Sequence, residues 1–102
     1  MRLYISGKIT GLEKSEYMKK FANAQLKLIS LGYSVINPAA VNSMLPEDTN
    51  YDEYMRMSMT MLEMCDGIYM LDNWQDSKGA NMELERAKEL GLKVYYETPV
   101  WK

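Results

Sequence analysis

The sequence predicts an α/β domain, a flavodoxin-like or Rossmann-like three-layer sandwich with a small parallel sheet between layers of helices. Four short runs of apolar, β-branched or aromatic residues alternate along the chain with three helical patterns. None of these runs alternates like a half-exposed strand, which favours parallel strands covered on both faces. The 102 residues have room for one domain, so we take residues 1–102 as a single unit.

The four predicted strands are each bounded by turn residues such as Gly7, Gly32 and Pro38. They are Arg2 to Ser6, Tyr33 to Ile36, Gly67 to Leu71, and Leu92 to Tyr96. Strands that alternate with helices are joined by right-handed crossovers. We therefore expect the strand order 2-1-3-4.

The three predicted helices follow from apolar residues spaced by three and four. They are Ser15 to Leu31, Tyr51 to Met64, and Gly79 to Leu90. Ser15 is the expected N-cap of the first helix, and Gly32 and Gly91 stand where a glycine ends a helix. Residues 37–50 form the longest irregular stretch, which we expect to be a lid or a wall of a pocket.

Composition excludes several classes of function. The net charge of −2 offers no basic field for nucleic acid or for an anionic membrane, and no apolar run approaches the roughly 20 residues that span a bilayer. The single cysteine, Cys65, cannot form an internal disulfide, and the chain contains no histidine for a triad or a metal site. With no secretory leader recognised before the first strand, we expect a soluble, cytoplasmic protein that needs neither metal nor cofactor.

The predicted strand order places the first and third strands side by side, with helices that leave on opposite faces. Ligands of such folds bind in the crevice at the carboxyl ends of these strands. The first strand delivers residues 6–11 to this crevice, including Ser6 and Gly7, and the third delivers residues 72–79. We expect any pocket to lie there.

Glu83 is the most informative residue of the third helix, because it borders the face that carries Ala80, Leu84 and Ala87. We place it in the first turn of that helix. An unpaired buried carboxylate is costly, so it needs a partner. One interpretation is that Glu83 caps backbone amides or pairs with a nearby cation. The other is that helix-terminal amides keep it ionised beside the crevice, where it is available as a nucleophile.

Two loops supply further candidates. The loop after the third strand combines Asp72, Trp74, the natural N-cap Ser77, and Gly79, which allows a ligand to approach the backbone. Its alternative interpretation is a polar loop with an aromatic cover over the core. The glycine-containing turn at residues 6–11 matches neither a phosphate-binding P-loop nor a dinucleotide fingerprint, so an ordinary tight turn is a better interpretation than a sugar or phosphate site.

The helix over residues 51–64 carries five methionines, spread over more than half of its circumference. Apolar surface in excess of what one core needs usually marks a contact surface. Core packing is the alternative. We expect self-association through this helix, as a homodimer or a higher homo-oligomer.

Taken together, four segments resemble the nucleoside 2-deoxyribosyltransferases and related nucleotide N-glycosidases. The segments are residues 3–11, 32–38, 65–71 and 77–83. In detail the chain is most similar to a compact branch, often found in phages and bacteria, called the DUF4406 family. The resemblance covers nearly the whole chain and implies a small-molecule nucleoside or nucleotide as partner.

The resemblance also implies roles. Glu83 would be the nucleophile that attacks the anomeric carbon, and Asp72 would serve the base as proton donor or orienting group. Tyr4 or Ser6 would position the sugar or the nucleophile. Ser77 and Gly79 would approach a 5′-hydroxyl or phosphate, and Gly7 and Trp74 would line the substrate site. The chain is shorter than the characterised transferases, and Trp74 takes up space near the site.

Two functions therefore stay open. The first is an N-glycosidase or 2-deoxyribosyltransferase that uses Glu83. The second is a module that binds a nucleotide-derived ligand without turnover, which the short chain and Trp74 favour.

Overall fold

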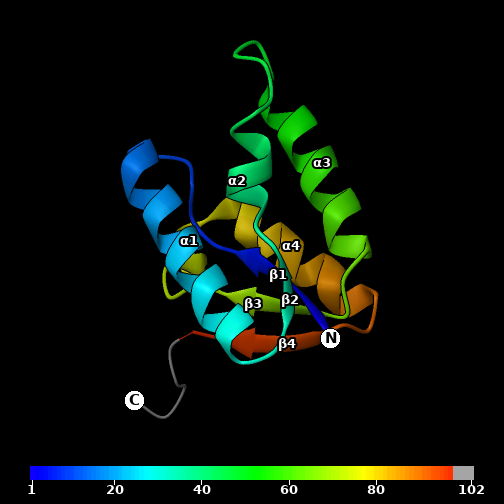
Figure 1. Ribbon diagram of the computed structural model, residues 1–102. Coiled ribbons are helices and arrows are strands. Elements are labelled where there is room, and N and C mark those ends of the chain that lie inside the picture. The colour runs from blue at the N-terminus through cyan, green and yellow to red at the C-terminus, as the bar shows by residue number, and fades with distance from the viewer. Residues whose placement is uncertain (98–102) are drawn as a thin grey trace.

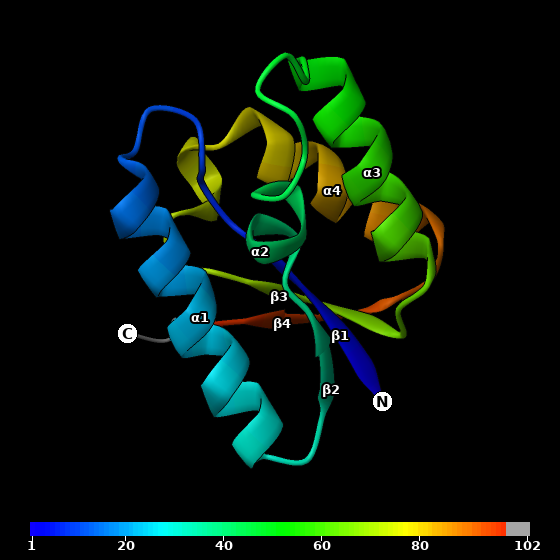
Figure 2. The ribbon, with the colours of Figure 1, turned by 45° about the horizontal axis from the view of Figure 1, so that its top comes forward.

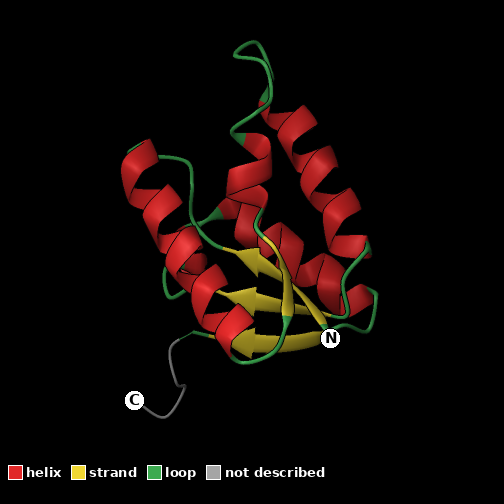
Figure 3. Cartoon of the chain, in the orientation of Figure 1, coloured by secondary structure: helices red, strands yellow, loops and turns green. Residues whose placement is uncertain are grey.

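The computed structural model describes residues 1–97. Figure 1 shows its elements in chain order, and Figure 3 shows helices and strands by type. The strands are β1 (Arg2–Ser6), β2 (Ser34–Ile36), β3 (Gly67–Met70) and β4 (Lys93–Tyr96). The helices are α1 (Lys14–Ser30), α2 (Pro38–Asn42), α3 (Tyr51–Glu63) and α4 (Lys78–Glu89), with a short 3₁₀ turn, η1, at Trp74–Asp76.

The four strands form one parallel sheet in the order β2-β1-β3-β4, which confirms the predicted fold class and strand order. Ile5 of β1 lies beside Tyr69 of β3, and Tyr69 lies beside Tyr95 of β4. The two central strands, β1 and β3, are buried along nearly their whole length. This burial explains why neither strand alternates in sequence.

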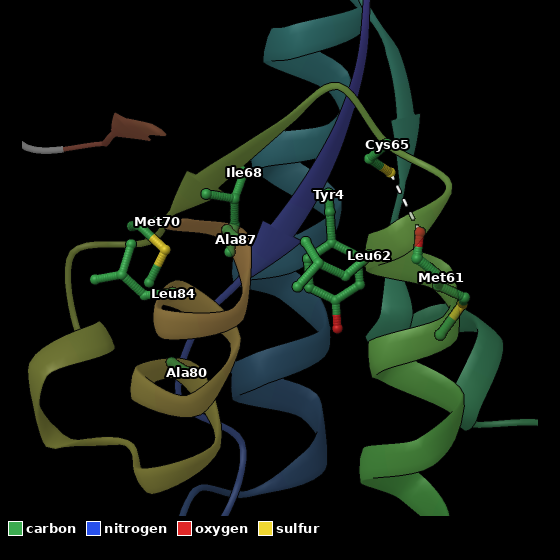
Figure 4. Packing of buried hydrophobic residues seen from close by; sticks show 9 residues of the cluster. All are labelled: Tyr4, Met61, Leu62, Cys65, Ile68, Met70, Ala80, Leu84 and Ala87. Atoms are coloured by element: carbon green, nitrogen blue, oxygen red, sulfur yellow. Dashed lines mark hydrogen bonds between the residues drawn. The ribbon is translucent and has the colours of Figure 1, made fainter. Parts of the chain in front are cut away.

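Each face of the sheet carries its own core. The α1-face cluster joins Leu3, Ile5 and Tyr69 to Phe21 and Leu28 of α1. The α4-face cluster joins residues of β1 and β3 to residues of α3 and α4, and Figure 4 shows its members. They are Tyr4, Met61, Leu62, Cys65, Ile68, Met70, Ala80, Leu84 and Ala87. Figure 2 shows α1 on one side of the sheet and α3 with α4 on the other.

The structure corrects two predicted boundaries. The first helix begins at Lys14, and its N-cap is Glu13, with no side-chain cap hydrogen bond, rather than Ser15. Part of the stretch expected to be irregular is helical: Asn37 accepts a hydrogen bond from the amide of Ala40, and Pro38 opens α2. An Asn N-cap followed by Pro at the first position is typical of the start of a helix, whereas Pro38 was predicted only to bound a strand.

Other helix ends agree with the sequence. Gly32 and Gly91 have φ values of +96° and +72°, which suits glycine after a helix. Asn50 and Glu53 form a capping box at the start of α3. Within residues 1–97, no helix combines the length and the apolar character that crossing a bilayer requires.

Candidate functional site

Glu83 lies inside the molecule, where α4 faces β1. Its side chain is only 7% exposed. The hydroxyl of Tyr4 donates a hydrogen bond to Oε2 and the hydroxyl of Ser6 donates one to Oε1, each at 2.6 Å. Both carboxylate oxygens therefore have a neutral donor, and no cation is paired with Glu83 among the described residues.

The pleat of β1 explains this pair of donors. Side chains two residues apart in a strand point to the same face. Tyr4 and Ser6 thus both face α4, while Leu3 and Ile5 face α1. Tyr4 reaches the carboxylate with its long ring, and Ser6 reaches it from the end of the strand. In Figure 4 the Tyr4 hydroxyl projects between α3 and α4.

The position and partners of Glu83 differ from the prediction. It is the sixth residue of α4, in the second turn rather than the first. The Ser77 side chain accepts a hydrogen bond from the amide of Ala80, and the amide of Asn81 donates to the Ser77 carbonyl. Amides at the start of α4 thus form hydrogen bonds with Ser77. The groups that donate hydrogen bonds to the Glu83 carboxylate are hydroxyls of β1, where helix amides had been expected.

Burial raises the pKa of Glu83 from 4.5 to about 7, and the hydrogen bonds from Ser6 and Tyr4 oppose this rise only in part. The expectation that helix amides keep the carboxyl firmly ionised is therefore wrong. Instead the group is poised between its two protonation states near neutral pH. Such a carboxyl can act as a nucleophile when ionised and as an acid when protonated.

Tyr4 is held as a neutral donor. Desolvation first, and then the charge of Glu83, raise its pKa well above 10. A side-chain hydrogen bond with Ser58 acts in the opposite direction. Ser58 is buried on the inner face of α3. The site is therefore a buried carboxyl of α4 held by two hydroxyls of β1, with Ser58 of α3 beside the Tyr4 hydroxyl.

Helix α3 forms the wall above this group. A Cβ atom added to Gly79 would stand 3.4 Å from Sδ of Met55 and 3.5 Å from the hydroxyl of Tyr51. Tyr51, Met55 and Ser58 are spaced by four and three, so they share one face of α3. Gly79 and Glu83 are likewise one turn apart on α4. These two faces meet, and α3 covers the approach to Glu83.

The structure places the other predicted site residues around this centre rather than in contact with Glu83. The exposed Asp72 accepts a hydrogen bond from Lys20 of α1 at 2.6 Å. Its backbone amide donates to a carboxylate oxygen of Glu97. Trp74 is half-buried and packs against Tyr96, with ring centroids 5.8 Å apart. The Ser77 hydroxyl caps α4, as predicted.

Gly7 has a packing reason to be glycine. A Cβ atom there would stand 2.6 Å from Cδ1 of Leu71, closer than real contacts allow. The turn after β1 also holds the amide of Lys8, which donates to Oδ1 of Asn73 at 3.0 Å. This hydrogen bond joins the loops after β1 and β3 at the carboxyl ends of the strands, where the crevice was predicted.

Two surface hollows lie away from this edge. One, of about 390 Å³, runs along the outer side of α4 past Met82 and Lys88. The other, of about 210 Å³, lies between the end of α1 and β4. Neither of these two hollows is lined by Glu83, and a pocket at the ends of β1 and β3 stays a prediction. In residues 1–97 no group of three or more potential metal ligands occurs.

Ser58 is the site residue that sequence reasoning missed. Its signal was its spacing: it lies seven residues after Tyr51 and four before Leu62, on the buried face of α3. A small hydroxyl on the apolar face of a helix needs a hydrogen-bond partner, and here that partner is Tyr4.

Comparisons with known proteins agree with the fold. The family model of DUF4406, described as a domain of unknown function, matches residues 1–96. A solved structure of a 2-deoxyribosyltransferase from the psychrotolerant bacterium Bacillus psychrosaccharolyticus superposes with a TM-score of 0.73 at 20% identity. The match covers 94% of this chain and 71% of that one. A search of curated proteins found no match.

Proposed function

Because the chain belongs to the DUF4406 family and has the fold of a 2-deoxyribosyltransferase, we propose that it cleaves the N-glycosidic bond of a nucleoside or nucleotide. In this proposal Glu83 is the nucleophile, and the sugar passes to water or to an acceptor base. The observation that carries the proposal is the buried Glu83 carboxyl, with its two oxygens held by Tyr4 and Ser6 and its pKa raised to about 7.

The chemistry balances without a metal or a cofactor. In the first step a Glu83 oxygen bonds to the anomeric carbon, the carbon–nitrogen bond breaks, and the leaving base takes a proton from protonated Asp72. In the second step water or an acceptor base attacks the same carbon, the ester to Glu83 breaks, and the proton of the attacking group returns to Asp72. The transition state resembles an oxocarbenium ion, which an adjacent carboxylate stabilises. Tyr4 and Ser6 fix the orientation of that carboxylate.

Asp72 is the proposed residue on the base side. It follows β3, the strand beside β1, and is exposed. There it would lend a proton to the base or orient it by a hydrogen bond. Lys20 would have to share or release it when substrate binds, since the two are 2.6 Å apart. Gly7, Ser77 and Gly79 would line the sugar side.

The test is to incubate the protein with 2′-deoxynucleosides and their 5′-monophosphates, with and without an acceptor base, and to follow free base by chromatography. We expect release from at least one substrate and loss of release in Glu83→Gln. Glu85→Gln, an exposed acid on the same helix, is the matched control and should stay active. Full activity in Glu83→Gln would contradict the nucleophile.

Binding without turnover is the second candidate, favoured by the cover of α3 over Glu83 and by the packing of Trp74 on Tyr96. A thermal-shift screen of nucleosides and nucleotides distinguishes the two. A compound that stabilises the fold and is recovered intact supports binding alone, because stabilisation grows with the ratio of ligand to its Kd. Recovery of free base supports the enzyme.

We further propose that the protein works in the cytoplasm and self-associates through α3. Met57 and Met64 of this helix are exposed, at 39% and 56%. Met61, in contrast, is buried in the core. A twofold pair of α3 helices would cover the exposed methionines, and twofold dimers are the commonest closed assemblies.

A further inference from the structure

A tyrosine-lined hollow lies on the side of the sheet opposite Glu83. It has a volume of about 210 Å³ and is bounded by the C-terminal end of α1 and by β3 and β4. Tyr69 and Leu3 of its lining belong to the α1-face cluster, whereas Tyr4 packs in the α4-face cluster beside Glu83. The hollow is thus separate from the candidate functional site and does not depend on its function.

The hollow exists because one helix cannot cover four strands. Helix α1 packs mainly over β1 and β2, and α4 covers β3 and β4 on the other face. Tyr33 and Tyr95 are left half-buried at the rim, with ring centroids 6.4 Å apart. Aromatic surface left beside a gap of this kind is a favourable wall for a flat ligand.

We propose that this hollow binds a small planar aromatic anion. The rings of Tyr33, Tyr69 and Tyr95, with Leu28 and Leu31, supply the apolar walls. Among the described residues that line the hollow, Lys27 is charged and none is acidic. An ammonium beside aromatic walls attracts the carboxylate or another anionic group of a ring-sized molecule.

Tyr69 gives an independent reason to expect a ligand atom here. Its side chain lines the hollow and is 5% exposed, yet its hydroxyl has no hydrogen-bond partner within the described residues. A buried hydroxyl without a partner is costly, and one acceptor removes that cost. Because this hydroxyl is buried, a ligand reaches it only when side chains of the lining move aside, and Lys27 and Leu31 of the lining are exposed.

The main alternative ligand is a cation, and the charge of the lining decides between an anion and a cation. Rings of tyrosine also form cages for quaternary ammonium groups, through cation–π attraction. Such cages gain from a nearby acid and lose from a nearby cation. Here the charged lining residue is Lys27, so the anion is favoured.

The test uses the full chain, labelled with ¹⁵N, and three probes that share a benzene ring and differ in charge: benzoate, benzyl alcohol and benzyltrimethylammonium. We expect benzoate to shift the amide signals of Leu28, Leu31 and Tyr95 at millimolar concentration, benzyl alcohol to bind more weakly, and the cation weakest. Lys27→Gln should lower benzoate affinity to that of benzyl alcohol. Lys19→Gln, on the same helix but outside the hollow, should not.

Tyr69→Phe tests the orphan hydroxyl. We expect the thermal midpoint without ligand to stay or rise, because an unsatisfied group is removed, and benzoate affinity to fall about fivefold, as for one neutral hydrogen bond. The proposal is overturned if benzoate shifts no signal at the hollow, if the three probes bind equally, or if shifts appear only around Glu83. A lower midpoint with unchanged affinity would show that the hydroxyl serves the fold instead.

Discussion

At the scale of single residues, the protonation of Glu83 links the site to stability. Its pKa is about 7 in the folded chain and 4.5 when unperturbed. The folded state therefore holds this proton more tightly than the unfolded state. The stabilisation is fully present below about pH 4.5 and is lost as the pH rises through about 7.

We predict that the free energy of unfolding of the unmodified protein, relative to Glu83→Gln, falls by about 3 kcal/mol between about pH 4 and pH 8. Urea unfolding of both proteins at several pH values measures the difference. Glu85→Gln should follow the unmodified protein throughout. A difference that does not change with pH would show that Glu83 titrates near its ordinary value in the fold.

Tyr4→Phe tests the hydroxyl that supports the carboxylate. The hydrogen bond from Tyr4 lowers the pKa of Glu83, so its loss should raise that pKa further. If the ionised form is the nucleophile, kcat/KM rises with pH through the pKa of Glu83, and Tyr4→Phe should move this rise to higher pH. Activity that falls as the pH rises through 7 would instead assign Glu83 as an acid.

Sequence reasoning at the residue scale identified Glu83 but not its chemistry. Its place on an inward face of a helix was readable from spacing, and so were Tyr4 and Ser6 as residues of a strand beside the crevice. The contact between them was implied only by the family resemblance, in which Tyr4 or Ser6 positions the nucleophile, and by no local pattern, because Tyr4 and Glu83 are 79 positions apart in sequence. The partner of a long-range contact is set by the register of β1 and α4, which no local pattern specifies.

At the scale of elements, two glycines near the site should respond in opposite ways to alanine. Gly7→Ala places a methyl 2.6 Å from Leu71, so we expect a loss of 1–3 kcal/mol or more, as for overpacked cores. Gly79 lies within α4 with room beside Met55. Gly79→Ala should therefore be neutral or stabilising by about 0.5–1 kcal/mol.

The two variants separate folding from substrate approach. Thermal or urea unfolding gives the stabilities, and base release gives the activity. A stable Gly79→Ala protein without activity would support close approach of substrate to Gly79. A stable and fully active one would remove Gly79 from the substrate site, and a Gly7→Ala protein as stable as the parent would contradict the packing at Leu71.

The N-terminal cap of α3 allows a second test at this scale. Asn50 and Glu53 bond each other's backbone amides. We predict that Asn50→Ala lowers the free energy of unfolding by about 1 kcal/mol. Asp48→Ala, at an exposed neighbouring position, should stay within about 0.5 kcal/mol. Urea unfolding measures both, and equal effects would mean that the box is not formed in solution.

Element boundaries show where local reasoning succeeds and fails. Capping signals at Ser77 and Gly32 were correctly predicted, because each acts within a few residues. Helix α2 was missed, although Asn37 and Pro38 are a good helix start, because five residues give too little periodicity to recognise. The cover of α3 over Glu83 was also missed, since crossing positions of helices depend on tertiary packing.

At the scale of the whole molecule, we predict a homodimer. Light scattering at micromolar concentration should give twice the chain mass of 11.8 kDa. Met57→Lys should shift the mass toward the monomer, because a charge would be buried at the interface. Leu26→Lys, at an apolar position of α1 that is 68% exposed against 39% for Met57, is the control. A monomer in the unmodified protein would refute the dimer.

The order of the strands determines when β1 can complete its pairing during synthesis of the chain. β1 ends at Ser6, but it stands in the middle of the sheet and pairs with β3, which begins at Gly67. At a synthesis rate of roughly 5–20 residues per second, β3 is made several seconds after β1. Over that interval β1 can form strand hydrogen bonds only with β2 or with another polypeptide. The apolar side chains that it would expose are those of Leu3, Tyr4 and Ile5. The segment that supplies Tyr4 and Ser6 to Glu83 is therefore open to a nascent-chain binding factor during this interval.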